Sequence, residues 1–259
     1  MPETDLSLLI DAANEAGRIA QNFIGPQARV WDKPGGAGPV TEADLAVNEM
    51  LEDKLRKARP DYGWLSEESL DSTDRQDTSR IFIVDPIDGT RSFIEGSKSW
   101  AHSLAIAENG QVIAAVVFLP MREKLYHAER GQGAFLNDTR IAPSTRSDLA
   151  GATLLAARPV MQAHHWQAGA PDVQRSHRPS LAYRLALVAE GRYDAMLTLR
   201  PTWEWDVAAG DLILREAGAV TSDRFGKPLR FNNPDPRQPG MVAAGPAVHR
   251  KLTQSLAKS

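Results

Sequence analysis

The sequence predicts a mixed α/β protein whose N-terminal part is of the α+β type. Apolar residues recur at helical spacing near the N-terminus. Short β-rich runs separated by turn signals then follow one another. Helical and strand-like segments alternate in the second half, which is typical of layered α/β folds. The 259 residues allow one large domain or two joined subdomains, and we expect a boundary near 140–150 that separates subdomains 1–145 and 146–259.

Two amphipathic helices are expected at the start of the chain. In residues 6–24, apolar side chains fall on one helical face. Residues 33–39, rich in glycine and proline, predict a mobile loop. Thr41 is expected to cap a second helix that ends before Pro60, and Asp44, three residues after the cap, fits a capping box.

The middle of the chain predicts an antiparallel meander. Residues 61–79 are mostly polar, and a buried strand is predicted at 81–84. Turn signals separate the runs that follow, which favours hairpin connections. The further strands are predicted at 103–107, 112–119, 124–128 and 134–136.

The second half predicts strands and helices in alternation. Strands are expected at 153–157 and 195–199, and helices at 181–189 and 205–217. The polar segment 160–179 predicts a long excursion from the regular structure.

Composition excludes several classes of protein. The net charge of -3 argues against a general nucleic-acid coat protein. Cysteine is absent, which excludes disulfides, thiolate nucleophiles and thiolate metal sites. The longest apolar run, Val112–Leu119, is far shorter than the roughly 20 residues of a membrane span. The N-terminus lacks the basic start of a signal peptide, so we expect a cytoplasmic protein.

The segment Asp85-Pro86-Ile87-Asp88-Gly89-Thr90 is the strongest chemical feature. Its two carboxylates leave the end of a predicted buried strand, and oxygen ligands of this kind suit Mg²⁺. If Thr90 begins a helix, its N–H groups offer a phosphate site. The alternative is an ordinary turn with a capping aspartate.

Further acidic residues lie near the ends of predicted elements. Glu67 and Glu68 precede the buried strand, where a solvated pair is the alternative. Asp206 lies where a helix begins and could simply be a first-turn acid. Together with Asp44, this acidic set would support metal-assisted hydrolysis of a phosphate ester.

These residues, in this order, resemble the lithium-sensitive, Mg²⁺-dependent phosphatases of the inositol monophosphatase superfamily. The resemblance covers nearly the whole chain. It implies the layered αβαβα sandwich of the inositol monophosphatase and fructose-1,6-bisphosphatase type. It also implies dependence on Mg²⁺, inhibition by Li⁺ and a small phosphorylated substrate. The matching segments are Asp44, Glu67-Glu68, Asp85 to Thr90, and Trp205 to Gly210.

The resemblance also implies a set of two or three Mg²⁺ ions. Glu67, Asp85 and the Ile87 carbonyl would hold the first ion. Asp85, Asp88 and Asp206 would hold the second, and Glu67 would reach a third through water.

The same resemblance assigns the groups around the attacked phosphate. Thr90, paired with Asp44, would orient and help deprotonate the attacking water. The backbone N–H groups of Gly89 and Thr90 would hold the phosphate, and Lys33 in the mobile loop would face the metals. The transfer would go directly to water.

The substrate branch is decided by other positions. Inositol monophosphatases usually carry a glutamate where this chain has Leu199. Segments 180–183, 187–191 and 201–206 are similar instead to bacterial 3'(2'),5'-bisphosphate nucleotidases, which act on 3'-phosphoadenosine 5'-phosphate. A bisphosphate needs a second anion site, which nearby arginines could supply. The substrate-binding set is then Asp88, Gly89, Thr90, Asp206, Ser180, Arg178, Arg184 and Arg200.

Three alternatives stay open. The enzyme could act on inositol-1-phosphate or more broadly on sugar phosphates, or on histidinol phosphate. Relatives on this fold also suggest a regulatory protein that binds RNA or RNA polymerase, although the net charge gives no support for RNA binding. Either a monomer or a homodimer is compatible with the resemblance.

Overall fold

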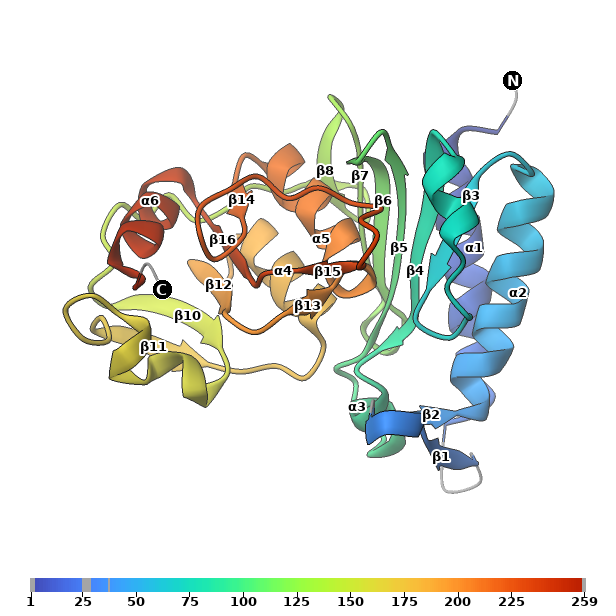
Figure 1. Cartoon of the computed structure of the whole chain (residues 1–259), viewed down its shortest axis with the longest axis horizontal. Coiled ribbons are helices and arrows are strands. Elements are labelled where there is room, and N and C mark those ends of the chain that lie inside the picture. Colours follow the sequence, from blue (N-terminus) through green and yellow to red (C-terminus); the bar gives the residue numbers. More distant parts are fainter. Residues whose placement is uncertain (1–2, 25–28, 37, 258–259) are drawn as a thin grey trace.

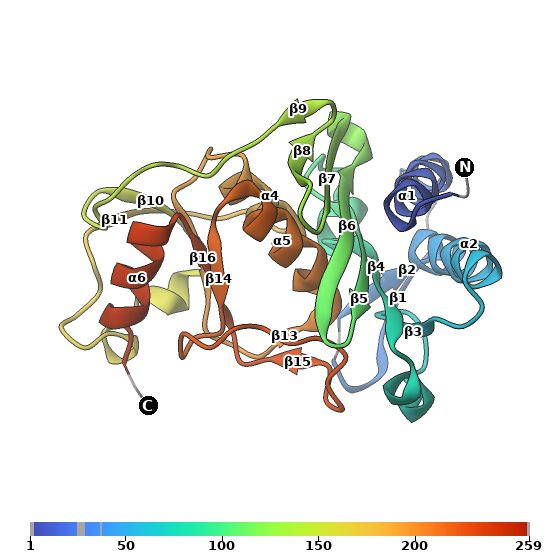
Figure 2. The same cartoon turned by 90° about the horizontal axis from the view of Figure 1, so that it is seen from above.

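The computed structural model describes residues 3–24, 29–36 and 38–257. Its elements form five layers, in the order helix, sheet, helix, sheet, helix (Figures 1 and 2). α1 and α2 cover the outer face of a seven-stranded sheet, α4 and α5 lie between the two sheets, and α6 covers the smaller sheet. This confirms the αβαβα fold class. The helices are α1 (Asp5–Gln21), α2 (Glu42–Ala58), α3 (Thr90–Ile94), α4 (Leu181–Ala189), α5 (Glu204–Ala217) and α6 (Pro246–Ser255).

The larger sheet has the strand order β3-β4-β5-β6-β7-β8-β9. All neighbours from β4 onward are antiparallel, which confirms the predicted meander. β3 was not expected in the polar segment 61–79. It pairs in parallel with β4, so it forms a strand because of this pairing and not because of a hydrophobic pattern in its own sequence. The strands are β3 (Gly63–Ser66), β4 (Arg80–Asp88), β5 (Ala101–Glu108), β6 (Gln111–Leu119), β7 (Lys124–Glu129), β8 (Gly133–Leu136) and β9 (Thr139–Arg140).

The smaller sheet has the order β11-β10-β12-β16-β14. β11 corrects the expectation of an irregular excursion over 160–179. It is an edge strand with three polar residues, and none of its four residues is fully buried, so it carries little hydrophobic signal. β14, β16 and α6 were also not predicted. The strands are β10 (Ala152–Ala156), β11 (Val173–Ser176), β12 (Ala195–Thr198), β14 (Val220–Ser222) and β16 (Met241–Ala244).

Two short ribbons complete the fold. β1 (Val30–Asp32) pairs with β2 (Pro39–Thr41), and β13 (Thr202–Trp203) pairs with β15 (Arg237–Gln238). Within the predicted loop 33–39, a 3₁₀ turn forms at Pro34–Gly36, and Ala37 lies outside the described residues. The mobility of this loop stays a prediction.

The close packing of α4 against α5 fixes the interior between the sheets. A Cβ at Gly210 would come within 2.4 Å of Leu185 Cδ1 and 2.6 Å of its Cβ, so only glycine permits this approach. The N-termini of both helices point to the end of β4, where the predicted motif lies.

None of the described helices is both long and apolar enough to cross a membrane.

Candidate active site

A β-bulge brings the two aspartates of the motif together. In a regular strand, side chains three residues apart point to opposite faces. Asp85 is paired with Ser103 and Asp88 with Ala101, so two residues of β4 face one residue of β5. The extra residue turns Asp85 and Asp88 toward the same side. Pro86, inside the bulge, has no N–H to leave unpaired there.

Asp206 completes an acidic cluster with these two residues. It lies in the first turn of α5. One carboxylate oxygen from each of Asp85, Asp88 and Asp206 lies within 4.8 Å of the other two. The sequence separation is large, so the folding of the second half against β4 creates this site.

The charges of the cluster oppose one another. Burial, followed by the neighbouring carboxylates Glu67 and Asp88, raises the pKa of Asp85 well above its usual range. Burial and the same neighbours raise the pKa of Asp206. Asp85 Oδ1 is buried and has no hydrogen-bond partner in the described part of the chain. A buried all-oxygen set with an orphaned carboxylate oxygen fits a hard divalent cation such as Mg²⁺.

Asp88 is fixed from the second half of the chain. Its Oδ2 accepts hydrogen bonds from Ser180 Oγ and from the backbone N–H of Ala182, both at 2.6 Å. Ser180 also caps α4, since its Oγ accepts from the N–H of Tyr183. These bonds lower the pKa of Asp88, but burial outweighs them and raises it. The second carboxylate oxygen, Oδ1, is left for another ligand.

Glu67 and Glu68 directly follow β3, and both form ion pairs with the ammonium group of Lys33. Lys33 Nζ lies 2.7 Å from Glu67 Oε1 and 2.6 Å from Glu68 Oε1. Burial works against the charge of Lys33, but the two carboxylates outweigh burial and raise its pKa. Burial raises the pKa of Glu68 to about 7. The loop 33–39 therefore touches the acidic site through Lys33.

Asp44 forms the predicted capping box and also contacts Thr90. Its Oδ2 accepts from the backbone N–H of Thr41 at 2.8 Å and from the Thr41 hydroxyl at 2.6 Å, which forms the capping box. Its Oδ1 accepts from Thr90 Oγ1 at 3.3 Å. Burial raises the pKa of Asp44 to about 6. A carboxylate whose pKa lies near neutral pH and that contacts a hydroxyl is suited to accept a proton from it.

Backbone groups of the motif line the same place. Gly89 has φ 99°, which favours glycine, and it directly precedes the short helix α3. The Thr90 hydroxyl donates to the Ile87 carbonyl oxygen at 3.2 Å.

The three predicted arginines have different surroundings. Arg178 donates to the Tyr193 hydroxyl at 2.8 Å and to the His177 carbonyl at 2.7 Å, so its guanidinium is already engaged. Arg184 is half-buried and is also engaged, since it donates to the Arg178 carbonyl and, at 3.2 Å, to the Pro179 carbonyl. Its charge and that of Arg200 lower the pKa of Asp206 against the stronger effect of burial. Arg184 and Arg200 thus act on the acidic cluster.

Leu199 does not present a polar group to the site. It is buried in the apolar cluster of the smaller sheet, and its carbonyl accepts from Arg224.

Sequence reasoning missed His102. Its Nδ1 contacts the Pro86 carbonyl directly opposite the bulge, and burial lowers its pKa to about 4. A polar residue at the start of the apolar run 103–107 was the available signal. The contact of the Ala182 N–H with Asp88 has no sequence signal, because any residue type supplies an N–H.

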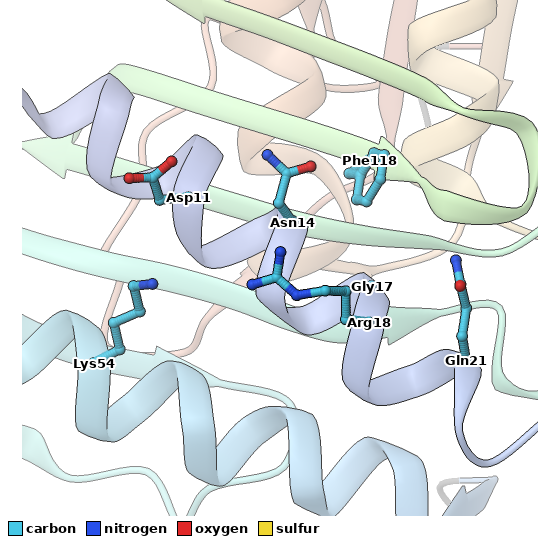
Figure 3. Close-up of a pocket in the computed structure, with 7 residues that line it drawn as sticks. All are labelled: Asp11, Asn14, Gly17, Arg18, Gln21, Lys54 and Phe118. Carbon is cyan, nitrogen blue, oxygen red and sulfur yellow. The ribbon is translucent and has the colours of Figure 1, made fainter.

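A separate cavity of about 510 Å³ lies on the outer side of the molecule, between α1, α2 and the larger sheet (Figure 3). None of its lining residues belongs to the acidic cluster, so this cavity is not part of the candidate active site. The lining residues are Asp11, Asn14, Gly17, Arg18, Gln21, Lys54 and Phe118.

Comparison with known proteins gives consistent results. A sequence profile described as "Inositol monophosphatase family" matches residues 1–259. An inositol-1-monophosphatase of Rhizobium meliloti is 36% identical over 237 residues, covering 86% of this chain and 88% of that protein. The Nus factor SuhB of Escherichia coli is 38% identical over 237 residues, covering 85% of each chain. The crystal structure of the extragenic suppressor protein suhB from Bartonella henselae has a TM-score of 0.82 and 31% identity, covering 97% of this chain and 98% of that chain.

Proposed function

Because this chain belongs to the inositol monophosphatase family, we propose that it is a Mg²⁺-dependent, Li⁺-sensitive phosphomonoesterase that transfers phosphate directly to water. One observation carries the proposal: the cluster of the buried Asp85 and Asp88 with the partly buried Asp206, in which Asp85 Oδ1 lacks a partner among the described residues. Such a cluster is costly unless a cation neutralises it.

The cluster and its neighbours would hold two or three Mg²⁺ ions. The ligands would be Glu67, Asp85, the Ile87 carbonyl, Asp88 and Asp206. When bound, Mg²⁺ supplies charge neutralisation of the phosphate and lowers the pKa of water. For Glu67 to bind an ion, Lys33 would release Glu67 and keep its contact with Glu68.

Thr90 and Asp44 would activate the attacking water. The Thr90 hydroxyl would accept the hydrogen bond of the water and pass a proton toward Asp44, with which it already forms a hydrogen bond. The pKa of Asp44, about 6, leaves its carboxylate mostly ionised and ready to accept a proton at neutral pH. The N–H groups of Gly89 and Thr90 would hold the phosphate oxygens.

For the substrate, we propose a small phosphate monoester with a second anionic group, with 3'-phosphoadenosine 5'-phosphate as the lead. Support comes from Arg184 and Arg200, whose charges act on Asp206. Arginine recognises phosphate through paired hydrogen bonds. The buried, apolar Leu199 supports the same choice, since it offers no acceptor to a sugar hydroxyl.

A paired assay tests this specificity. Initial phosphate release is measured from 3'-phosphoadenosine 5'-phosphate and from inositol-1-phosphate, at equal low concentration with Mg²⁺. We expect a preference for the nucleotide that Arg200→Met weakens by raising KM. Arg178→Met is the matched control, because its guanidinium already contacts Tyr193. No preference, or an equal effect of both variants, would contradict the second anion site.

Inositol-1-phosphate is the second candidate substrate, because relatives that are 34–36% identical to this chain are named inositol-1-monophosphatases. A preference for it in the same assay would leave the metal chemistry intact and reassign the substrate.

The name Nus factor, given to relatives that are 38% identical, supports a regulatory role as the non-enzymatic alternative. Asp88→Asn separates the two possibilities: an enzyme loses turnover, whereas a regulatory protein keeps its function. Purified protein that released no phosphate from any small monoester with Mg²⁺ would overturn the enzymatic proposal.

A further inference from the structure

A hydrogen-bond network with two buried charges joins the helix that carries Asp206 to the other half of the molecule. It consists of Arg75, Asn232, Asn233 and Glu204. Arg75 lies in the short 3₁₀ helix after β3, and Glu204 is the first residue of α5. Arg75 is 4% exposed and Glu204 is fully buried. Buried charges of this kind are rare unless they are fully paired.

Glu204 binds the loop before β15. Its Oε2 accepts from the backbone N–H of Asn232 at 2.6 Å. Its Oε1 accepts from the backbone N–H of Asn233 at 3.0 Å and from the Asn233 side-chain amide at 2.6 Å. Three N–H donors therefore converge on one carboxylate. Since an amide would offer only one acceptor oxygen, both carboxylate oxygens are needed to accept from them.

Asn232 connects this loop to Arg75. Its Oδ1 accepts from an Arg75 guanidinium nitrogen at 2.6 Å, and its Nδ2 donates to the Arg75 carbonyl at 3.0 Å. Arg75 is itself held by Asp71, at 2.6 and 3.0 Å, and donates to the Asn233 carbonyl at 2.9 Å. The loop is thus fixed to the segment that follows Glu67 and Glu68.

The first turn of α5 is held from a second side. Ser103, paired with Asp85 across the strands, donates its hydroxyl to the Trp205 carbonyl at 2.9 Å. On the other side, the Glu204 N–H donates to the Pro236 carbonyl at 2.9 Å. β13 and β15 lie below α4 and α5 in Figure 2. Asp206 follows in this same turn, so the backbone that carries its side chain is held by contacts on both sides.

Glu204 is the acceptor that these N–H groups require. An apolar residue at the start of α5 would leave the backbone N–H groups of Asn232 and Asn233 without this acceptor. Glu204 also ties the turn that carries Asp206 to the loop before β15. The network therefore maintains the geometry of the turn from which Asp206 extends.

We propose that Glu204, held by the Arg75–Asn232 network, is a positioning residue that sets the affinity of the acidic cluster for its divalent cation. The inference rests on the proposed function, since it assumes that the cluster binds a cation. The network holds Asp206 near Asp85 and Asp88 against their repulsion. Groups that hydrogen-bond directly to a metal ligand commonly change metal affinity by about 10–100-fold when they are removed, and Glu204 acts on the ligand Asp206 through the turn that they share.

Calorimetric titration of the metal-free protein with Mn²⁺ tests the proposal without relying on activity. Glu204→Gln is nearly isosteric but replaces an acceptor oxygen by a donor, and we expect it to raise the dissociation constant about tenfold or more. Asp211→Asn is the matched control. It alters another buried carboxylate on α5, which contacts Thr221 and Arg215, and is expected to lower stability but not Mn²⁺ affinity.

A second variant keeps the test decisive if Glu204→Gln does not fold. Asn232 has φ 63°, a conformation that glycine adopts freely, so Asn232→Gly keeps the backbone N–H to Glu204 while removing the amide contacts with Arg75. We expect this variant to fold and to bind Mn²⁺ more weakly than the wild type.

The outcomes separate the two proposals. If the wild type binds no Mn²⁺, the proposed metal-dependent function fails. If the wild type binds Mn²⁺ and both Glu204→Gln and Asn232→Gly bind it as tightly as the wild type, the network has only a structural role and the inference is wrong. If Asp211→Asn weakens binding as much as Glu204→Gln, the effect is general destabilisation and the inference is likewise wrong.

Discussion

Asp85→Asn is expected to raise stability in the absence of Mg²⁺ and to lose most or all of that advantage in its presence. Asp85 is 1% exposed. Its Oδ1 has no hydrogen-bond partner within the described ranges. An ionised carboxylate in this position costs free energy, because burial removes its water and its neighbours are also acidic. Asparagine has nearly the same shape, carries no charge and can donate to a neighbouring carboxylate.

The magnitude follows from the orphaned oxygen. A buried polar group without a partner costs about 1–3 kcal/mol, and more if it is charged. We therefore expect Asp85→Asn to raise the free energy of unfolding by about 1–3 kcal/mol in EDTA. Mg²⁺ at 100 times its dissociation constant would add about 2.7 kcal/mol to the wild type. The variant loses this gain, since a neutral amide is a poor replacement for a shared carboxylate ligand.

The pH dependence has a definite sign. The pKa of Asp85 is raised in the folded protein, so the folded state holds its proton more tightly than the unfolded chain, whose aspartates titrate near about 4. The contribution of Asp85 to the stability of the wild type is fully present below that pH and is lost as the pH rises through the pKa that Asp85 has in the folded protein. The advantage of Asp85→Asn in EDTA is therefore absent in acid and grows toward neutral pH.

Urea unfolding, followed by fluorescence in EDTA and in saturating Mg²⁺, measures both effects. Asp211→Asn serves as the control, because the Asp211 carboxylate accepts from Thr221 at 2.6 Å and Arg215 at 3.0 Å. Its removal should lower stability under both conditions. The reasoning would be refuted if Asp85→Asn were less stable than the wild type in EDTA at neutral pH, or if it gained as much stability from Mg²⁺.

Three further substitutions test other parts of the structure. Gly210→Ala gains about 1 kcal/mol of helix propensity, but the clash with Leu185 costs about 1–3 kcal/mol, so urea unfolding should show net destabilisation; an increase in stability would contradict the close helix packing. His102→Gln removes a buried imidazole whose pKa is lowered to about 4 from 6.5. As the pH falls, the unfolded chain binds a proton at this histidine before the folded protein does. The free energy of unfolding of the wild type, measured with urea, should therefore fall by about 2 kcal/mol relative to this variant between neutral pH and pH 5. A difference between the two proteins that stays constant with pH would show that His102 is not held neutral. Thr90→Ala should lower kcat by about 10²–10⁴-fold while calorimetry shows unchanged Mn²⁺ affinity; near-normal turnover would remove Thr90 from the water-activating role.

The sequence alone predicted the elements whose signals are local. α1, α2, α4 and α5 follow from apolar spacing and from caps such as Thr41, whose hydrogen bonds span only three residues. The meander from β4 to β8 follows from apolar runs and turn residues. The motif residues Asp85 and Asp88 could be selected because they are close in sequence and chemically unusual at the end of a buried strand. Elements without such patterns were missed: β3 and β11 are strands because of the neighbours with which they pair.

Tertiary structure decided which of the selected residues meet. Asp206 reaches Asp85 only because α5 packs between the two sheets, and Asp88 is fixed by donors 92 and 94 residues away. Periodicity carries no information on such distant contacts, because they depend on packing across the whole chain. The same holds for Arg178, whose guanidinium is bound by Tyr193, and for Glu204, whose partners lie 28 and 29 residues away. The sequence determined which groups could do the chemistry; packing determined which of them meet, and at what cost in buried charge.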